Sequence, residues 1–131
     1  MATVVLAGGG TAGHIEPALA VARQWAAVHP HDRLIFLGTS SGLETTLVPA
    51  ANFPLHLIPR VRISRTPSAS WLKIPVDLLS SVRACSKVVK SSSAVVGFGG
   101  YVSAPAYIAA KLAGVPIVIH EANAKPGWAN R

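Results

Sequence analysis

The sequence predicts a doubly wound α/β domain built on a parallel sheet. Short apolar runs alternate along the chain with longer segments of helical spacing, which is the order expected of strands and crossover helices. Among these apolar runs the first, at residues 4–7, is continuous rather than alternating, as in a strand that is covered on both faces. Two of them end in glycine-rich turns that precede helical segments. Together these observations predict helices on both sides of a central sheet.

The predicted elements follow in order along the chain. Apolar runs predict five strands, at residues 4–7, 34–37, 55–58, 94–96 and 115–119. Helical patterns lie between them, from about residue 14 to 28, at 43–48, at 71–90 and from 103 to about 114. The segment 59–70, rich in Arg, Ser and Pro, is expected to be a loop.

Proline, serine and glycine mark the expected helix ends. Pro17 is tolerated in the first turn of its helix, Pro49 is expected to stop the short helix at residue 48, and Pro75 should limit or kink the next one. Ser103 is positioned to cap the last helix, and Gly114 marks its end.

Composition indicates one compact domain. The chain has 131 residues, half of them hydrophobic and only 13% charged, so a large core is available and disorder is not expected. Cys85 is the single cysteine, which excludes an intrachain disulfide and fits a reducing, cytoplasmic setting; we expect it in the core. Met1 is followed by an apolar run too short for a signal peptide, and no stretch is long enough to span a bilayer.

The chain is basic, with a formal net charge of +7 from 12 Lys and Arg against 5 Asp and Glu. Much of the excess lies between residues 60 and 90, opposed there by Asp77. A basic surface suits nucleic acid, anionic lipid or a phosphorylated ligand. Nucleic acid is not expected as a partner, because the chain has no helix-turn-helix and no aromatic RNA-binding signature.

The glycine turns predict an anion-binding crevice. They span residues 8–14 and 97–101, and each combines close backbone approach with the positive end of a following helix, which favours phosphate or diphosphate. Ligands of doubly wound sheets bind at the carboxyl ends of the strands, where the strand order reverses. His14, and His120 with Glu121 after the last strand, are expected at the same edge.

A dinucleotide site is the first alternative, since Gly8, Gly10 and Gly13 satisfy the spacing G-x-G-x-x-G. Such folds place an acidic residue at the end of the second strand to bind the ribose. Here that strand ends in Leu37-Gly38-Thr39-Ser40, and Glu44 lies well beyond it. The sequence therefore argues against a dinucleotide-dependent oxidoreductase, which stays open as an alternative.

Three ordered motifs resemble the amino-terminal half of the MurG family of N-acetylglucosaminyl transferases. The resemblance covers nearly the whole chain and is carried by residues 9–14 with 17–20, residues 97–105, and residues 120–127 with Asn130. It implies two Rossmann-like domains of the GT-B type, of which residues 1–131 would form the acceptor-binding domain. The nucleotide-sugar domain is absent from this sequence, so the chain alone is expected to be inactive. Ala12 departs from the family, which usually has Gly there.

The resemblance implies an inverting transfer of N-acetylglucosamine from its UDP form to lipid I, giving lipid II, at the cytoplasmic face of the bacterial membrane. Its catalytic candidates are His14, as general base, and Glu121. The alternatives are a histidine that caps the helix or binds diphosphate, and a structural carboxylate. The implied donor-binding residues are Thr11, Ala12, Gly13 and Asn123, although Asn123 also suits a turn. The implied acceptor-diphosphate residues are Gly9, Gly10, Gly99, Gly100 and Tyr101, of which the last three also suit a plain turn. No cofactor and no metal are expected.

A membrane contact is expected where the basic loop meets the third helical segment. Apolar side chains rimmed by cations bind anionic lipid, and the candidates are Trp71, Leu72, Ile74, Arg62, Arg65 and Lys73. The alternative is an ordinary amphipathic helix whose apolar stripe belongs to the core. A non-catalytic module that binds anionic lipid or polyprenyl diphosphate stays open as a second function, and cell-wall synthesis proteins are candidate partners.

Overall fold

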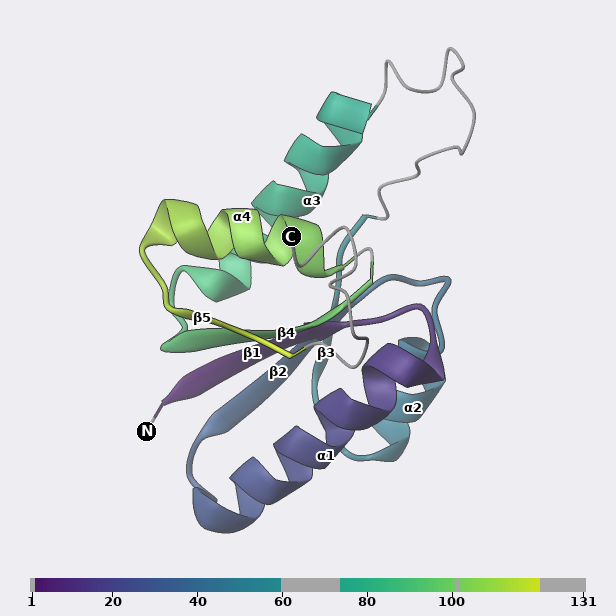
Figure 1. Cartoon of the computed structure of the whole chain (residues 1–131), viewed down its shortest axis with the longest axis vertical. Coiled ribbons are helices and arrows are strands. Elements are labelled where there is room, and N and C mark those ends of the chain that lie inside the picture. Colours follow the sequence, from purple (N-terminus) through teal and green to yellow (C-terminus); the bar gives the residue numbers. More distant parts are fainter. Residues whose placement is uncertain (1, 60–73, 101, 121–131) are drawn as a thin grey trace.

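A computed structural model describes residues 2–59, 74–100 and 102–120 of the chain. Within these residues, strands and helices alternate as the sequence predicts (Figure 1). The strands are β1 (Thr3–Gly8), β2 (Arg33–Gly38), β3 (Leu55–Leu57), β4 (Ala94–Gly99) and β5 (Ile117–Ile119). The helices are α1 (Ala12–Val28), α2 (Glu44–Ala50), α3 (Ile74–Val89) and α4 (Ser103–Ala113).

The sheet is parallel throughout, with the strand order β3-β2-β1-β4-β5. The chain steps outward from β1 to β3 and then returns to place β4 on the other side of β1. The strand order therefore reverses between β1 and β4, which is where doubly wound sheets bind ligands. At this point Gly8 pairs with Gly99, after an irregularity in register between Ala7 and Gly8. The predicted fold class is confirmed.

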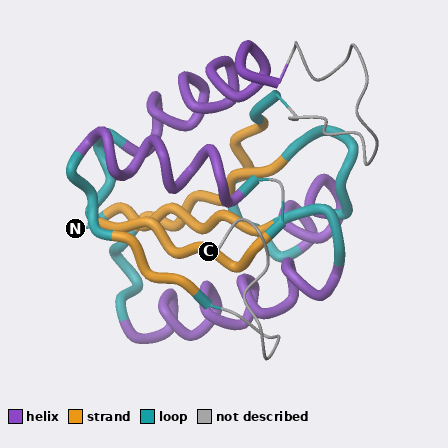
Figure 2. Tube along the Cα trace, turned by 45° about the horizontal axis from the view of Figure 1, so that its top comes forward, coloured by secondary structure: helices purple, strands orange, loops and turns teal. Residues whose placement is uncertain are grey.

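Helices cover both faces of the sheet, α1 and α2 on one and α3 and α4 on the other (Figures 1 and 2). Successive residues of β1 serve opposite faces, because side chains alternate along a strand. Val4 and Leu6 pack with α1 and α2, whereas Val5 and Ala7 pack with α3 and α4. Both pairs of side chains are buried, so every residue from 4 to 7 is apolar and the run is continuous.

Several predicted boundaries are wrong by a few residues. Helix α1 begins at Ala12 rather than at residue 14, and α2 runs through Pro49 to Ala50. Proline removes only its own N–H, and the turn beyond it still closes, because the Ala51 N–H donates to the Leu47 carbonyl at 3.2 Å. Strand β5 begins only at Ile117, since the Val115 N–H first closes the end of α4 on Ala110. Gly114 ends α4 at φ 72°, as predicted.

Two predictions near the second glycine turn need correction. Strand β4 continues through Gly97 and Phe98 to Gly99, so the turn itself is confined to the residues after it. Ser103 is the first residue of α4 rather than its cap, which is Val102. Gly97 has a packing role, because a Cβ there would collide with the ring of Tyr107.

Cys85 lies in the core on α3, as predicted, and burial raises the pKa of its thiol to about 12. Val82 and Val89 of the same helix are also buried, and Leu78 packs against them. Val76 and Leu79 point away from the core and are 65% and 51% exposed. The apolar residues of α3 are therefore divided between core and surface.

Candidate functional site

The two glycine turns touch each other at the switch point. Gly100 has φ 87°, and a Cβ built on it would lie 2.6 Å from the Gly9 carbonyl oxygen and 3.2 Å from His14 Nδ1. Positive φ and this close approach both require glycine. The turn after β4 therefore packs directly against the turn after β1, and the predicted crevice edge is built from both.

Ser103 ties the ends of β1 and β4 together. Its hydroxyl accepts the Gly99 N–H at 3.0 Å, and its single proton is shared between the carbonyl oxygens of Ala7 and Gly99, each 2.9 Å away. All of these groups are buried. The side chain expected to cap a helix instead fixes the spacing of the two strands that carry the glycine turns.

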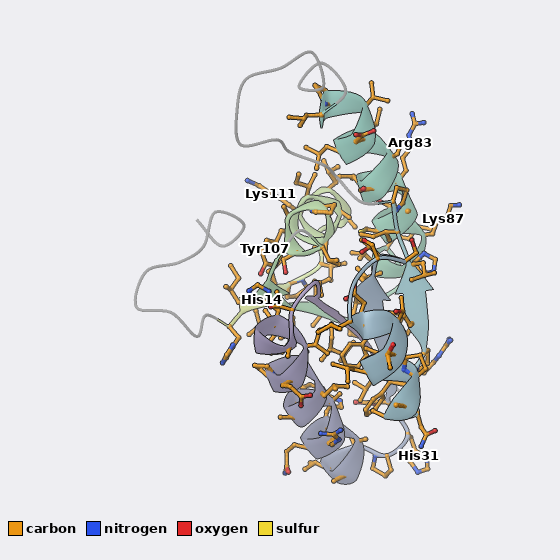
Figure 3. The ribbon with its side chains drawn as sticks, turned by 90° about the vertical axis from the view of Figure 1, so that its right-hand side faces the viewer. His14, His31, Arg83, Lys87, Tyr107 and Lys111 are labelled. Carbon is orange, nitrogen blue, oxygen red and sulfur yellow. The ribbon has the colours of Figure 1, made fainter. Side chains whose placement is uncertain are left out.

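His14 lies in the first turn of α1 and is half-buried. Its Nδ1 is 3.3 Å from the Gly9 carbonyl oxygen and 3.3 Å from Thr11 Oγ1. Figure 3 labels it where α1 begins, below Tyr107 of α4. The loop that precedes the helix thus holds one edge of the imidazole ring through the atom Nδ1.

Glu44 is a site residue that the sequence analysis missed. It is fully buried at the start of α2, and its carboxylate accepts the Thr39 N–H at 2.8 Å, the Thr39 hydroxyl at 3.3 Å and the Gly10 N–H at 3.0 Å. A Cβ on Gly9 would lie 2.9 Å from Glu44 Oε1, and Gly38 and Gly42 leave room for the same side chain. Glu44 therefore joins the loop after β2 to the first glycine turn.

A pocket of about 180 Å³ opens between these loops. Its wall offers main-chain and hydroxyl groups beside a larger apolar area and is formed by Gly9, Gly10, Thr11, Thr39, Ser41, Gly42 and Val102. The pocket contains no lysine or arginine among these residues. Such a surface suits neutral polar groups as well as the backbone contacts expected of an anion site.

The structure brings together six of the predicted site residues, Gly9, Gly10, Thr11, His14, Gly99 and Gly100, around the contact between the two turns. Ala12 and Gly13 occupy the first turn of α1 and are exposed. The Gly10 N–H, predicted to hold diphosphate, is bonded to Glu44 here. The roles assigned to all of these residues stay predictions.

Other predicted residues lie outside the described ranges: Tyr101, Glu121, Asn123, Arg62, Arg65, Trp71, Leu72 and Lys73. Ile74 is described and lies half-buried at the start of α3. The residue before Glu121, His120, is held at the sheet edge: its N–H donates to the Gly97 carbonyl at 2.8 Å, and its ring stacks near Phe98.

Among the described residues, no group of three His, Cys, Asp or Glu side chains is arranged to hold a metal ion. His56 lies against α3, where Nε2 donates to the Ala84 carbonyl at 3.2 Å, a structural role. No helix in the described ranges has the length and hydropathy needed to cross a bilayer.

A parallel, doubly wound sheet with two glycine turns at its switch point defines a Rossmann-like ligand-binding domain. Residues 4–131 match the glycosyltransferase family 28 N-terminal domain, and the chain belongs to that family. This membership removes the oxidoreductase alternative. The structure agrees, since Glu44, the acidic residue after β2, is bonded to main chain rather than directed outward for a ribose.

Curated relatives are similar over almost the entire chain. UDP-N-acetylglucosamine-N-acetylmuramyl-(pentapeptide) pyrophosphoryl-undecaprenol N-acetylglucosamine transferase of Rhodococcus erythropolis is 53% identical over 98% of the chain, and that of Streptomyces coelicolor is 52% identical. The chain spans 35% and 36% of the length of these relatives.

Solved structures show the same fold. The crystal structure of Acinetobacter baumannii MurG matches with a TM-score of 0.82 and 33% identity, covering 99% of this chain and 38% of that one. The calicheamicin glycosyltransferase CalG4 matches with a TM-score of 0.63 over 98% of this chain and 34% of that one; its 15% identity supports the fold alone. The fold is therefore that of a GT-B amino-terminal domain.

Proposed function

We propose that this chain is the acceptor-binding domain of an inverting transferase that moves N-acetylglucosamine from its UDP form to lipid I, giving lipid II. The names of relatives with more than half of the aligned residues identical support the substrates. The observation that carries the proposal is the placement of His14 at the contact between the two glycine turns. In this assignment most of the nucleotide-sugar site belongs to a second domain, and the chain spans 35% and 36% of the length of the two relatives.

The proposed chemistry needs a base and an anion cradle. The acceptor hydroxyl attacks the anomeric carbon, the bond to UDP breaks with its electron pair on the phosphate oxygen, and His14 accepts the hydroxyl proton. Gly9, Gly10, Gly99, Gly100 and Tyr101 would hold the acceptor diphosphate, and Thr11, Ala12, Gly13 and Asn123 the donor. Glu121 would orient or assist.

The helix starts support an anion at this edge. The first N–H groups of a helix lack intrahelical acceptors and form its positive end. Neither α1 nor α4 has an acidic residue in its first turn, so neither helix carries a carboxylate that neutralises its own positive end. Both helices begin within a few residues of a glycine turn, and their positive ends therefore add to the same site.

A peripheral membrane contact is proposed on α3 and the segment before it. The exposed side chains of Val76 and Leu79 are accompanied on this helix by the exposed cations Arg83 and Lys87, and Figure 3 shows both cations extending from it. Each basic residue near an anionic surface contributes about 1 kcal/mol. With the predicted residues Trp71, Leu72, Ile74, Arg62, Arg65 and Lys73, this surface would bind the cytoplasmic face of the membrane.

The test is transfer of labelled N-acetylglucosamine to a short-chain lipid I analogue. The protein would be this chain fused to the carboxyl-terminal portion of the Rhodococcus erythropolis relative. His14→Ala should reduce transfer by about 10²-fold or more if His14 is the base. His31→Ala is the matched control, because His31 is exposed at the other end of α1 (Figure 3). A folded fusion that binds lipid I without transfer would instead favour the non-catalytic lipid-binding module.

A further inference from the structure

We propose that Glu44 is a positioning residue that fixes the tautomer of His14 through the peptide group between Gly9 and Gly10. The inference rests on the proposed function, in which His14 is the base.

The first step is the contact between Glu44 and the peptide. Glu44 Oε2 accepts the Gly10 N–H at 3.0 Å, and Oε1 is held by the Thr39 N–H at 2.8 Å and the Thr39 hydroxyl at 3.3 Å. Glu44 is fully buried, so water does not compete for these donors. The carboxylate therefore has a fixed orientation relative to the first glycine turn.

The second step is the geometry of the peptide itself. The described residues contain no cis peptide bond, and in a trans peptide the N–H and the preceding carbonyl point in opposite directions. The Gly10 N–H is directed at Glu44, and the Gly9 carbonyl belongs to the same planar group. That carbonyl oxygen lies 3.3 Å from His14 Nδ1. One rigid group thus has the carboxylate on one side and the imidazole on the other.

The third step is the tautomer. The Gly9 carbonyl oxygen can only accept, so this contact requires the proton on Nδ1; the Thr11 hydroxyl, also 3.3 Å from Nδ1, can donate or accept and fits either tautomer, so the carbonyl makes the difference. The other ring nitrogen, Nε2, then keeps its lone pair, which is what a general base requires. A carboxylate on the N–H side also polarises the peptide, and this strengthens its carbonyl as an acceptor. In hydrolytic triads an acidic side chain accepts the Nδ1 proton directly and fixes the histidine tautomer; here the Gly9–Gly10 peptide stands between the carboxylate and the imidazole.

The surrounding glycines support this role. Gly9 lies so close to Glu44 Oε1 that a Cβ would approach it to 2.9 Å, and Gly100 packs on the Gly9 carbonyl from the other turn. The peptide therefore has little freedom to flip. A flip would direct the Gly10 N–H away from Glu44 and leave a buried carboxylate oxygen without this donor, which is costly.

The test is the tautomer of His14, measured by long-range ¹H–¹⁵N correlation on this chain with ¹⁵N-labelled histidine, in alkaline buffer where imidazole is neutral. His14→Ala assigns the signals. We expect Nδ1 protonated in the unmodified chain. In Glu44→Gln, an amide NH₂ would face the Gly10 N–H or the Thr39 donors, and we expect a mixture of tautomers.

The matched control is Asp32→Asn. Asp32 is also a carboxylate that accepts a main-chain N–H, from Ala2 at 2.9 Å, but it contacts Trp25 rather than the glycine turn. This variant should leave the His14 tautomer unchanged. An Nε2-protonated His14 in the unmodified chain would overturn the proposal even if Glu44→Gln did not fold. So would a folded Glu44→Gln chain whose tautomer is unaltered.

Kinetics of the fusion protein separate this proposal from the proposed function. Glu44→Gln should lower kcat by about tenfold or more, which is part of the rate enhancement that general-base catalysis supplies. The KM for UDP-N-acetylglucosamine should change by less than about twofold. Transfer with normal kcat in Glu44→Gln overturns the positioning role and leaves the proposed function intact. If His14 has the expected tautomers but the folded fusion never transfers N-acetylglucosamine, the proposed function is refuted and the positioning of His14 by Glu44 still holds.

Discussion

Replacing Gly100 by Ala should destabilise the domain more than the same change at another glycine with positive φ. Gly100, Gly10 and Gly114 all have positive φ, at 87°, 90° and 72°. An L-residue in the left-handed region costs roughly 1–2 kcal/mol, a cost common to the three variants. A Cβ at Gly10 or Gly114 meets no atom within 4 Å, whereas at Gly100 it lies 2.6 Å from the Gly9 carbonyl oxygen.

The difference between the variants isolates the contact between the turns. Forcing an atom into a packed site costs about 1–3 kcal/mol, so Gly100→Ala should lower the free energy of unfolding by about 2–5 kcal/mol and Gly114→Ala by about 1–2 kcal/mol. Urea denaturation of each variant, followed by circular dichroism, measures both. Equal losses for Gly100→Ala and Gly114→Ala would show that the two glycine turns do not touch as described.

Three further predictions concern single side chains. Cys85 should resist alkylation in the folded chain at pH 8 and react after unfolding, because burial raises its thiol pKa to about 12; rapid native labelling would contradict this. Ser103→Ala should lower the free energy of unfolding by about 1–3 kcal/mol, because the buried Gly99 N–H loses its acceptor. Calorimetry measures this loss, with Ser91→Ala, at an exposed serine, as the control. The Ala2 N–H, and then the Trp25 indole, lower the pKa of Asp32, so the unmodified chain should have a higher free energy of unfolding than Asp32→Asn. This difference should be full above about pH 5 and should shrink as acid protonates the carboxylate. A difference that does not change with pH would refute the assignment.

The sequence predicted the architecture because its signals were local and redundant. Strand β1 is a continuous apolar run because Val4 and Val5 face opposite helical layers and are both buried. Boundaries were less predictable. Pro49 was expected to end α2, but the N–H of Ala51 closes the next turn, and no residue pattern before Pro49 records that bond.

The candidate site was predictable where glycine marks it and not where tertiary contacts define it. The positions of Gly9 and Gly100 follow from their turns, and the switch point brings the turns together. Glu44 gave no such signal, because an acidic residue at the start of a helix is common on surfaces. It accepts a hydrogen bond from a residue 34 positions earlier in the chain. A weak hint was available: the chain has only 5 acidic residues, and this one follows Gly38 and Gly42.

The bond between Glu44 and Gly10 also narrows where an anionic substrate can bind. The glycine turn predicts an anion site, yet its Gly10 N–H is already donated to a buried carboxylate of the same chain. A diphosphate placed on that N–H would meet a like charge. The first N–H groups of α1, at Ala12 and Gly13, have no acceptor within the helix and lie beyond the Gly10 peptide. We therefore revise one contact of the proposed site: the diphosphate is expected at the first N–H groups of α1, beside His14 and Gly100, rather than on the Gly10 N–H. The pocket next to Thr39 and Ser41 is then left to neutral polar groups of the substrate.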